Sequence, residues 1–414
     1  MFDANKTVFI LGAGASWHYG YPTGEELTKK VIAKARMAVD YFTTVLKSPE
    51  NGVVHRPNYI TSKSPDPLPD GLTGMRAEWS TAIEECNDLI TRLTTVDPLV
   101  IDYFLGQNQH LADIGRFLIA WVLLECEGLY LRERGNLNRR EILLRSSTQV
   151  ERARGLGPNL DVRQFSDNWY RFLIHNLVTG CANPEGLLDN KVTFITFNYD
   201  VSLEYQMFRA LSAIEYFSKN NLVEQFFEGD RIIHVYGRLR ENPTTEPPTI
   251  NLNLFGGSAP QPGPPALWTE TKALFDTVYT ASRQIRTMAP HEKIIDPTVE
   301  TAMRAVADAN CVYILGYGFD EHNSRLLDLP NSLNLEKTHK TVMFTNFEDY
   351  NLVKKKASRV FFGRPDRLLA HKPAIMVMGG ETDYYLCEKS VRNVYDALAF
   401  DFDSPEEHLL PQRS

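Results

Sequence analysis

Short apolar segments that end in turn residues recur along this 414-residue chain and decide its predicted fold class. Their apolar residues do not alternate with polar ones, which is typical of strands buried on both faces of a parallel sheet. Helical patterns separate them, as the crossovers between parallel strands require. We therefore predict an α/β fold, a Rossmann-like parallel sheet flanked by helices. The predicted strands are 7–11, 192–197, 231–236, 311–315 and 341–345, with a weaker one at 374–378.

The chain changes character between about 40 and 185, where helical patterns are long and strand-like segments are few. A first helix should begin ahead of this block, because Thr23 followed by Glu26 fits a capping box. We interpret the block as a helical insertion after the first βα unit. Two proline-bearing stretches, 48–71 and 241–265, are predicted surface loops. The predicted organisation is an α/β domain at 1–40 and 186–400, a helical insertion at 41–185 and a C-terminal tail at 401–414.

The composition speaks against several kinds of binding partner and metal site. The net charge is −8 and no Lys/Arg-rich run occurs, so we expect no direct binding of nucleic acid, which needs clustered cations. The five cysteines form no C-x-x-C pair, which speaks against a disulfide framework and a thiolate zinc site. No apolar stretch reaches the roughly 18 residues of a membrane span. We expect a cytoplasmic protein without a metal site.

The first predicted strand runs directly into a glycine-rich turn, "LGAGAS", at 11–16. Glycines at this place let the backbone turn sharply and approach a pyrophosphate closely. The third glycine of the usual dinucleotide fingerprint is missing, because position 17 is Trp. A tight turn without a ligand remains the alternative.

Polar or glycine residues follow the other predicted strands as well. Asn198 and Asp200 follow the second, and a site, a helix cap or an Asx turn would account for them. His234 lies on the third strand, where a buried and satisfied histidine is the alternative. Gly316 and Gly318 follow the fourth, and the fifth ends near Asn346. Because ligands of parallel α/β sheets bind beyond the carboxyl ends of the strands, we expect one shared crevice.

These motifs together resemble the sirtuin family, in its divergent branch of bacterial antiviral defence. Asn346 lies where the family has an asparagine near the adenosine ribose. The resemblance covers roughly 1–40 and 185–380, whereas no motif of the family covers the helical block. The motifs that carry it are G-A-G-A-S at 12–16 with G-Y-P at 20–22, T-F-N-Y-D at 196–200, H-V-Y-G at 234–237 and G-Y-G-F-D at 316–320.

The resemblance implies NAD as ligand and substrate. Asn198 would orient a water or the hydroxyl of the nicotinamide ribose, and Asp200 would hold the nicotinamide carboxamide. Backbone amides at 13 and 14 would face the pyrophosphate, and residues 316 and 318 the adenosine half. The implied catalytic residues are Asn198, His234 and Asp200. The implied NAD-binding residues are Gly12, Ala13, Gly14, Ser16, Asp200, Tyr236, Gly237, Gly316, Gly318 and Asn346.

Two departures from the family pattern affect the expected activity. The family's histidine immediately precedes the glycine, where this chain has Tyr236, and His234 lies two residues earlier. Because positions i and i+2 of a strand share a face about 6.6 Å apart, we favour His234 as the base over a base that is lost or moved. The four-cysteine zinc module of deacylating sirtuins is missing, and Thr23-Gly24 replaces their phenylalanine-arginine pair. Both differences speak against deacylation.

The expected function is therefore hydrolysis of NAD at the nicotinamide–ribose bond, which would deplete NAD in anti-phage defence. Hydrolysis and cyclisation of the ADP-ribose product stay open. The resemblance implies gating by a homo-oligomer or by a partner, such as a HerA-type DNA-translocating ATPase or an Argonaute-like protein, with the helical block as the candidate contact. A non-catalytic sensor or scaffold that binds NAD or ADP-ribose is the alternative, and an NAD-dependent deacylase is a weaker one.

Overall fold

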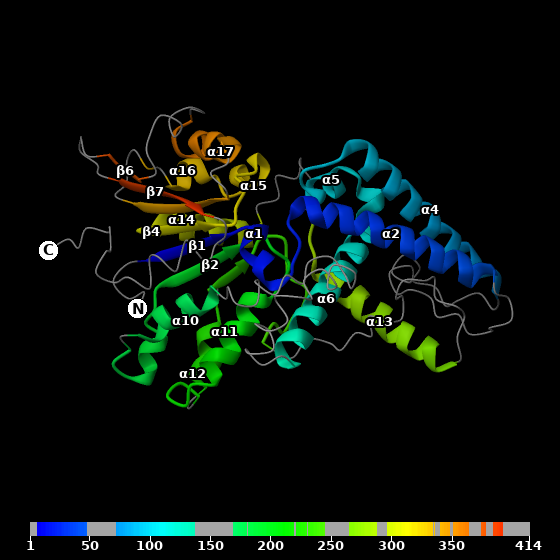
Figure 1. The fold of residues 1–414 in the computed structure, drawn as a ribbon, viewed down its shortest axis with the longest axis horizontal. Helices are drawn as coiled ribbons and strands as arrows, with labels where there is room; N and C mark the ends of the chain where they lie inside the picture. Colours follow the sequence, from blue (N-terminus) through cyan, green and yellow to red (C-terminus); the bar gives the residue numbers. More distant parts are fainter. Residues whose placement is uncertain are drawn as a thin grey trace, which may run out of the picture.

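A seven-stranded sheet with helices on both faces, joined to a lobe of long helices, makes up the described part of the chain (Figure 1). The computed structural model describes residues 6–47, 72–136, 169–179, 181–218, 221–229, 231–244, 265–287, 296–333, 335, 340–347, 351–363, 374–377 and 384–391. The predicted loop at 48–71 and the predicted tail at 401–414 lie wholly outside these residues. Most of the predicted loop at 241–265 lies outside them as well.

The sheet has the strand order β3-β2-β1-β4-β5-β7-β6, and every neighbouring pair is parallel except β6 with β7. This confirms the predicted α/β fold with a parallel sheet. The weak segment at 374–378 forms a strand, but it runs antiparallel at the edge. The strands are β1 Thr7–Leu11, β2 Val192–Thr196, β3 Ile232–His234, β4 Cys311–Leu315, β5 Thr341–Phe347, β6 Ala374–Val377 and β7 Tyr384–Val391.

Strand β1 lies at the centre of the parallel strands, and all five of its residues are buried. The ring of Phe9 stacks between two aromatic rings of the neighbouring strands, 5.1 Å from Phe194 on β2 and 4.8 Å from Tyr313 on β4. Burial on both faces explains why the apolar segments do not alternate with polar residues.

Two groups of helices pack beside the sheet (Figure 1). One group comprises α10, α11 and α12, and the other comprises α14, α16 and α17, with α15 beside them. Their bounds are α10 Tyr170–Val178, α11 Ser202–Ser212, α12 Leu222–Phe227, α14 Pro297–Asp308, α15 Glu321–Leu326, α16 Leu329–Leu333 and α17 Asn351–Phe362, with a 3-10 turn, η3, at Pro184–Leu187.

The remaining long helices form the helical lobe, which we define as α2, α4, α5, α6 and α13 (Figure 1). Its core is aromatic, with Phe275 of α13 in contact with Phe117 and Trp121 of α6 and with Phe42 of α2. The bounds are α2 Gly24–Lys47, α4 Leu72–Val96, α5 Ile101–Gln107, α6 Ala112–Asn136 and α13 Pro265–Gln284, with short helices α1 Ala13–Ser16, η1 Trp17–Tyr19 and η2 Gln109–Leu111.

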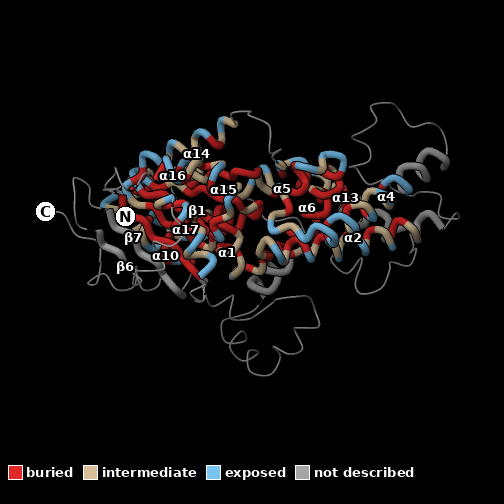
Figure 2. Tube along the Cα trace, turned by 90° about the horizontal axis from the view of Figure 1, so that it is seen from above, coloured by how far each residue is buried: buried red, intermediate tan, exposed pale blue. Residues whose placement is uncertain are grey.

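The lobe does not coincide with the predicted insertion at 41–185. Helix α10 falls within that range but packs on α11 beside the sheet, whereas α13 lies later in the chain and packs on α6. Buried positions run without a break from the sheet into the lobe (Figure 2), so both parts share one apolar core. At the start of α2 the backbone N–H of Thr23 donates to Glu26 Oε2 at 2.8 Å, as one half of the predicted capping box requires. None of the helices described combines the length and apolar character needed to cross a bilayer.

Candidate functional site

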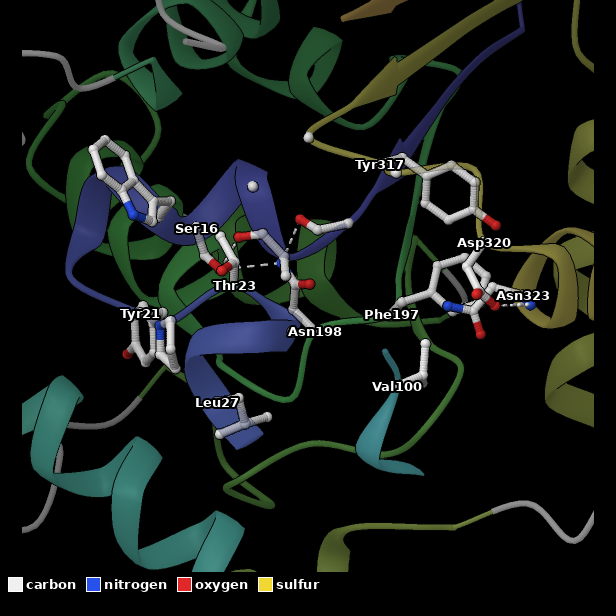
Figure 3. Close-up of a pocket in the computed structure, with 18 of the residues that line it drawn as sticks. Ser16, Tyr21, Thr23, Leu27, Val100, Phe197, Asn198, Tyr317, Asp320 and Asn323 are labelled. Atoms are coloured by element: carbon white, nitrogen blue, oxygen red, sulfur yellow. Dashed lines mark hydrogen bonds between the residues drawn. The ribbon is translucent and has the colours of Figure 1, made fainter. Parts of the chain in front are cut away.

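A cavity of about 690 Å³ opens where β1, β2, β4 and β5 end (Figure 3). The chain leaves β1 for β2 on one side and continues from β4 to β5 on the other, so the cavity lies at the point where the strand order reverses. This is the place where open α/β sheets bind ligands. The volume lies within the range of about 300–1,000 Å³ that is typical of small-molecule pockets.

The turns after β1 and β4 pack backbone against backbone at the floor of the cavity. The amide of Gly14 donates to the Gly316 carbonyl at 3.0 Å, and Gly316 has a φ of 59°. A Cβ at Gly316 would lie 2.1 Å from the Ala15 nitrogen, and one at Gly12 would lie 2.6 Å from the Gly316 oxygen. The fold itself therefore requires these glycines. Because the Gly14 amide is engaged, Gly14 cannot offer it to a pyrophosphate in this conformation.

Gly318 differs from the other glycines of these turns. It lines the cavity, a Cβ there would meet no atom within 4 Å, and its φ lies outside the left-handed region. No contact among the described residues therefore demands glycine at this position. The space beside its Cα belongs to the cavity, and a ligand that passes close to the backbone would account for the missing side chain.

Phe319 and Asp320 fix the turn that carries Gly318. Phe319 has a φ of 49°, and its buried ring packs on Phe344 and Phe361, each 5.5 Å away between ring centroids. Asp320 Oδ1 accepts the amides of His322 and Asn323 and so caps α15. Core packing and a helix cap together hold the backbone in a conformation that a phenylalanine rarely adopts.

Asn198 crosses from the end of β2 to the turn after β1. Its Nδ2 donates to the Gly12 carbonyl at 3.0 Å and to Ser16 Oγ at 3.1 Å (Figure 3). Since a backbone carbonyl only accepts, the side-chain amide has one possible orientation. Oδ1 then remains as the free acceptor of Asn198 at the cavity, with no partner among the described residues. It can accept a hydrogen bond from a water or a hydroxyl.

Asp200 also lines the cavity, but its carboxylate is partly used by the chain. Oδ1 accepts the Ser202 amide at 3.1 Å and the Ser202 hydroxyl, which is the Asx-type turn that the sequence left as an alternative. Burial raises the pKa of Asp200, and hydrogen bonds from Ser202 and Ser16 partly offset this. Asp200 therefore holds the turn through Oδ1, and its carboxyl group can also bind a ligand carboxamide at the cavity.

His234 does not line the cavity, and both of its ring nitrogens are occupied. Nδ1 lies 3.0 Å from the Asn198 carbonyl oxygen, to which it donates, and Nε2 lies 2.6 Å from Glu204 Oε1. Burial lowers the pKa of His234, but the charge and hydrogen bond of Glu204 outweigh it and the pKa is raised. The geometry favours a buried imidazolium that holds the backbone of Asn198 through its carbonyl. A direct role of His234 as the base stays a prediction, and this conformation does not support it, because His234 does not line the cavity.

Tyr236 lines the cavity where the family pattern would have its histidine, and its hydroxyl donates to Asn323 Oδ1. The helical lobe provides the facing wall through Leu99, Val100, Ile101 and Asp102 at the start of α5 (Figure 3). There the Tyr199 hydroxyl donates to Asp102 Oδ1. The lobe is thus part of the site and is joined to the segment after β2 by a hydrogen bond.

One cation and several carboxyl groups line the cavity. Lys356 of α17 is the only lysine or arginine among the described lining residues. Nearby, the Thr345 hydroxyl accepts the Gly316 amide at 2.8 Å and ties β5 to the turn after β4. An anionic ligand would therefore find its one favourable charge at the β5 side of the cavity.

The structure brings most of the predicted site residues together around this cavity. Three do not line it: His234, Gly237, whose Cβ would lie 2.0 Å from the Gln284 oxygen, and Asn346, which is fully buried on β5. The predicted residues that line it are Gly12, Ala13, Gly14, Ser16, Asn198, Asp200, Tyr236, Gly316 and Gly318. Sequence reasoning missed Asp102, Thr345 and Lys356, because no motif marks them.

Compared with protein-family models, with curated proteins and with solved structures, the chain gives no match. The cavity geometry must therefore carry any functional interpretation. The cavity lies at the reversal point of the sheet, between two glycine turns, and is lined by an amide and carboxyl groups. A cavity of this size at this place suits a small-molecule ligand.

Proposed function

We propose that this chain hydrolyses NAD at the bond between nicotinamide and ribose, giving nicotinamide and ADP-ribose. One observation carries the proposal: the amide of Asn198, held by the Gly12 carbonyl, faces the same cavity as Gly318, whose missing side chain no packing contact explains. An acceptor for the attacking water and a glycine turn that leaves room for a nucleotide thus occur together at the ligand-binding edge of the sheet.

The chemistry suits this set of groups. Nicotinamide leaves NAD as a neutral molecule from a cationic linkage, so positive charge develops on the ribose as the bond breaks. Carboxyl groups at Asp102 and Asp200 line the cavity and can stabilise that charge, while Asn198 Oδ1 orients the water. The resemblance to sirtuin-like defence proteins supports the same reading, and it supports gating by a homo-oligomer or by a HerA-type partner.

A second candidate, a sensor or scaffold that binds NAD or ADP-ribose without cleaving it, has a specific observation in its favour. No imidazole nitrogen faces the cavity from the described residues, because His234 is paired on both nitrogens and Tyr236 occupies the expected place. If no other group accepts a proton, binding without turnover is the expected result.

An assay of NAD loss and nicotinamide release on the full chain tests the proposal, with wild type compared to Asn198→Ala. Asn176→Ala is a matched control, because its Nδ2 likewise donates to a backbone carbonyl, that of Phe172, on a helix away from the cavity. We expect nicotinamide release by wild type and the control, and its loss in Asn198→Ala. Equal release by all three refutes the assignment, and binding of ADP-ribose without any release supports the sensor.

A further inference from the structure

Two walls of different origin face each other across the cavity. Ser16 and Asn198 belong to the sheet edge, whereas Val100 lies across the cavity from Ser16 on the segment that begins α5 (Figure 3). Asp102 is the acidic residue of this second wall, and it is half-buried. The helical lobe therefore delivers two carboxyl groups to the cavity, Asp102 of α5 and Glu26 of α2.

Hydrogen bonding fixes where this carboxyl group lies. Its Oδ1 accepts the hydroxyl of Tyr199, which is the residue directly after Asn198. The Tyr199 ring lies 6.4 Å from the ring of Tyr236 between centroids. The carboxyl group of Asp102 is thus held beside Tyr199 and close enough to Tyr236 to raise the pKa of that phenol. Tyr236 supplies no proton acceptor of its own, and Asp102 can supply one.

We propose that Asp102 is the catalytic base of this site, accepting a proton from the water that Asn198 orients; the proposal rests on the proposed NAD hydrolysis. The C1′–nitrogen bond breaks and its electron pair stays on the nicotinamide nitrogen. The water oxygen forms a bond to C1′, and one water proton passes to the Asp102 carboxylate. The products are nicotinamide, ADP-ribose and a proton that Asp102 later releases to solvent.

The other carboxyl groups of the cavity are less suited to this role, because each holds a structural turn or helix start. Asp200 Oδ1 binds Ser202, Asp320 Oδ1 caps α15, and Glu26 Oε2 accepts both donors of Thr23. Asp102 accepts a hydrogen bond from its own backbone amide, but its side-chain partner is a phenol that lines the same cavity.

Burial raises the pKa of Asp102 to about 6, and the hydrogen bond from Tyr199 lowers it against this trend. A carboxyl group with such a pKa is mostly ionised at neutral pH and still basic enough to take a proton from a water. Removal of the Tyr199 hydroxyl should therefore raise the pKa of Asp102 further. Tyr199 and Tyr236 are the titratable groups that interact with Asp102 directly. Glu26 and Asp200 line the same cavity. On neighbouring elements, Arg116 of α6, paired with Asp113, acts on Tyr199, and His322 of α15 contacts Tyr103 of α5.

The test measures kcat/KM for NAD against pH in wild type, Asp102→Asn and Tyr199→Phe, with ADP-ribose binding followed by calorimetry. Wild-type kcat/KM should fall below about pH 6, and Asp102→Asn should lose about 10²–10⁴-fold together with this acid limb. Tyr199→Phe should move the acid limb to higher pH. Asp88→Asn on α4, whose carboxylate binds Arg92 and His110 away from the cavity, is the matched control and should match wild type.

Each other outcome has a defined meaning. An active Asp102→Asn variant that keeps the wild-type acid limb overturns the role of Asp102 and leaves the hydrolysis standing. A variant that no longer binds ADP-ribose also overturns it, because Asp102 then builds the site and does not act as its base. Wild-type protein that releases no nicotinamide in any assembly state refutes the proposed hydrolysis itself.

Discussion

Alanine at Gly316 and alanine at Gly318 should have opposite effects, although the two residues belong to the same turn. At Gly316 the φ of 59° and the contact of 2.1 Å between a Cβ and the Ala15 nitrogen both oppose a side chain. The left-handed conformation costs about 1–2 kcal/mol for a non-glycine residue, and overpacking adds about 1–3 kcal/mol. Gly316→Ala should therefore lower the free energy of unfolding by about 2–5 kcal/mol.

Gly318→Ala meets neither penalty, because no atom of the described part of the chain lies within 4 Å of the added Cβ and the φ is outside the left-handed region. Alanine also reduces the conformational entropy of the unfolded chain, which stabilises by about 0.4–1 kcal/mol where the backbone conformation is compatible. The new methyl group would, however, project into the cavity. If a nucleotide passes there, overpacking against it should weaken its binding by about 1–3 kcal/mol, or about 5–150-fold.

Thermal unfolding and calorimetric titration with ADP-ribose separate these effects on the two variants. We expect a lower melting temperature for Gly316→Ala, and for Gly318→Ala an unchanged or slightly higher one with weaker binding. Wild-type affinity in a folded Gly318→Ala variant would show that the ligand does not approach this turn. Equal destabilisation of both variants would refute the distinction between a glycine kept for packing and one kept for a ligand.

Three further predictions concern the charge of Lys356, the buried pair of His234 and Glu204, and the ring of Phe319. Lys356→Ala should weaken ADP-ribose binding and reduce its salt dependence, whereas Lys355→Ala, on the exposed side of the same helix, should leave both unchanged in calorimetry. Because the pKa of His234 is raised by Glu204, the stabilisation that His234 gives is full below about pH 6.5 and is lost as pH rises through the folded-state value. In Glu204→Gln burial stays the largest influence and lowers the pKa, and the hydrogen bond to the Asn198 carbonyl offsets it only in part. The pH dependence of urea unfolding between about pH 5 and 9 should therefore reverse sign, and equal slopes would contradict this. Phe319→Ala removes a buried ring and should cost about 3–5 kcal/mol in the same unfolding measurement, while an unchanged midpoint would show that the ring does not anchor the turn.

The sequence was sufficient to predict the sheet and the edge at which the site forms. Segments such as 7–11 are apolar throughout because they are buried on both faces, and parallel strands bring their carboxyl ends to one edge, so Asn198 and Gly318 could be placed there together. Strand β7, "YYLCEKSV", escaped prediction because Glu388 and Lys389 interrupt its apolar pattern. Strands whose residues are all apolar could be predicted from the sequence. A strand near the edge of the sheet that carries charged residues could not.

The prediction of His234 as the base rested on a strand geometry that ends too early. Alternate residues share a face only within a strand, and β3 stops at His234. Beyond it the chain turns through Gly237, which has a φ of 78°. His234 thus faces Glu204, and Tyr236 reaches the cavity. Asp102 could not be found from sequence because its position depends on how α5 docks against the sheet edge, which no local pattern records.

Glycines at strand ends are weaker signs of a nucleotide site than their number suggests. Gly12, Gly14 and Gly316 each have a reason inside the protein, because two neighbouring turns can pack backbone on backbone only if none carries a Cβ. A chain without any ligand would need them equally. Gly318 has no such reason, and Asn198 is held so that its acceptor remains free at the same cavity. Gly318 and Asn198 are thus the two residues at this edge that a nucleotide would explain and packing does not, and their variants are the ones that should respond to it.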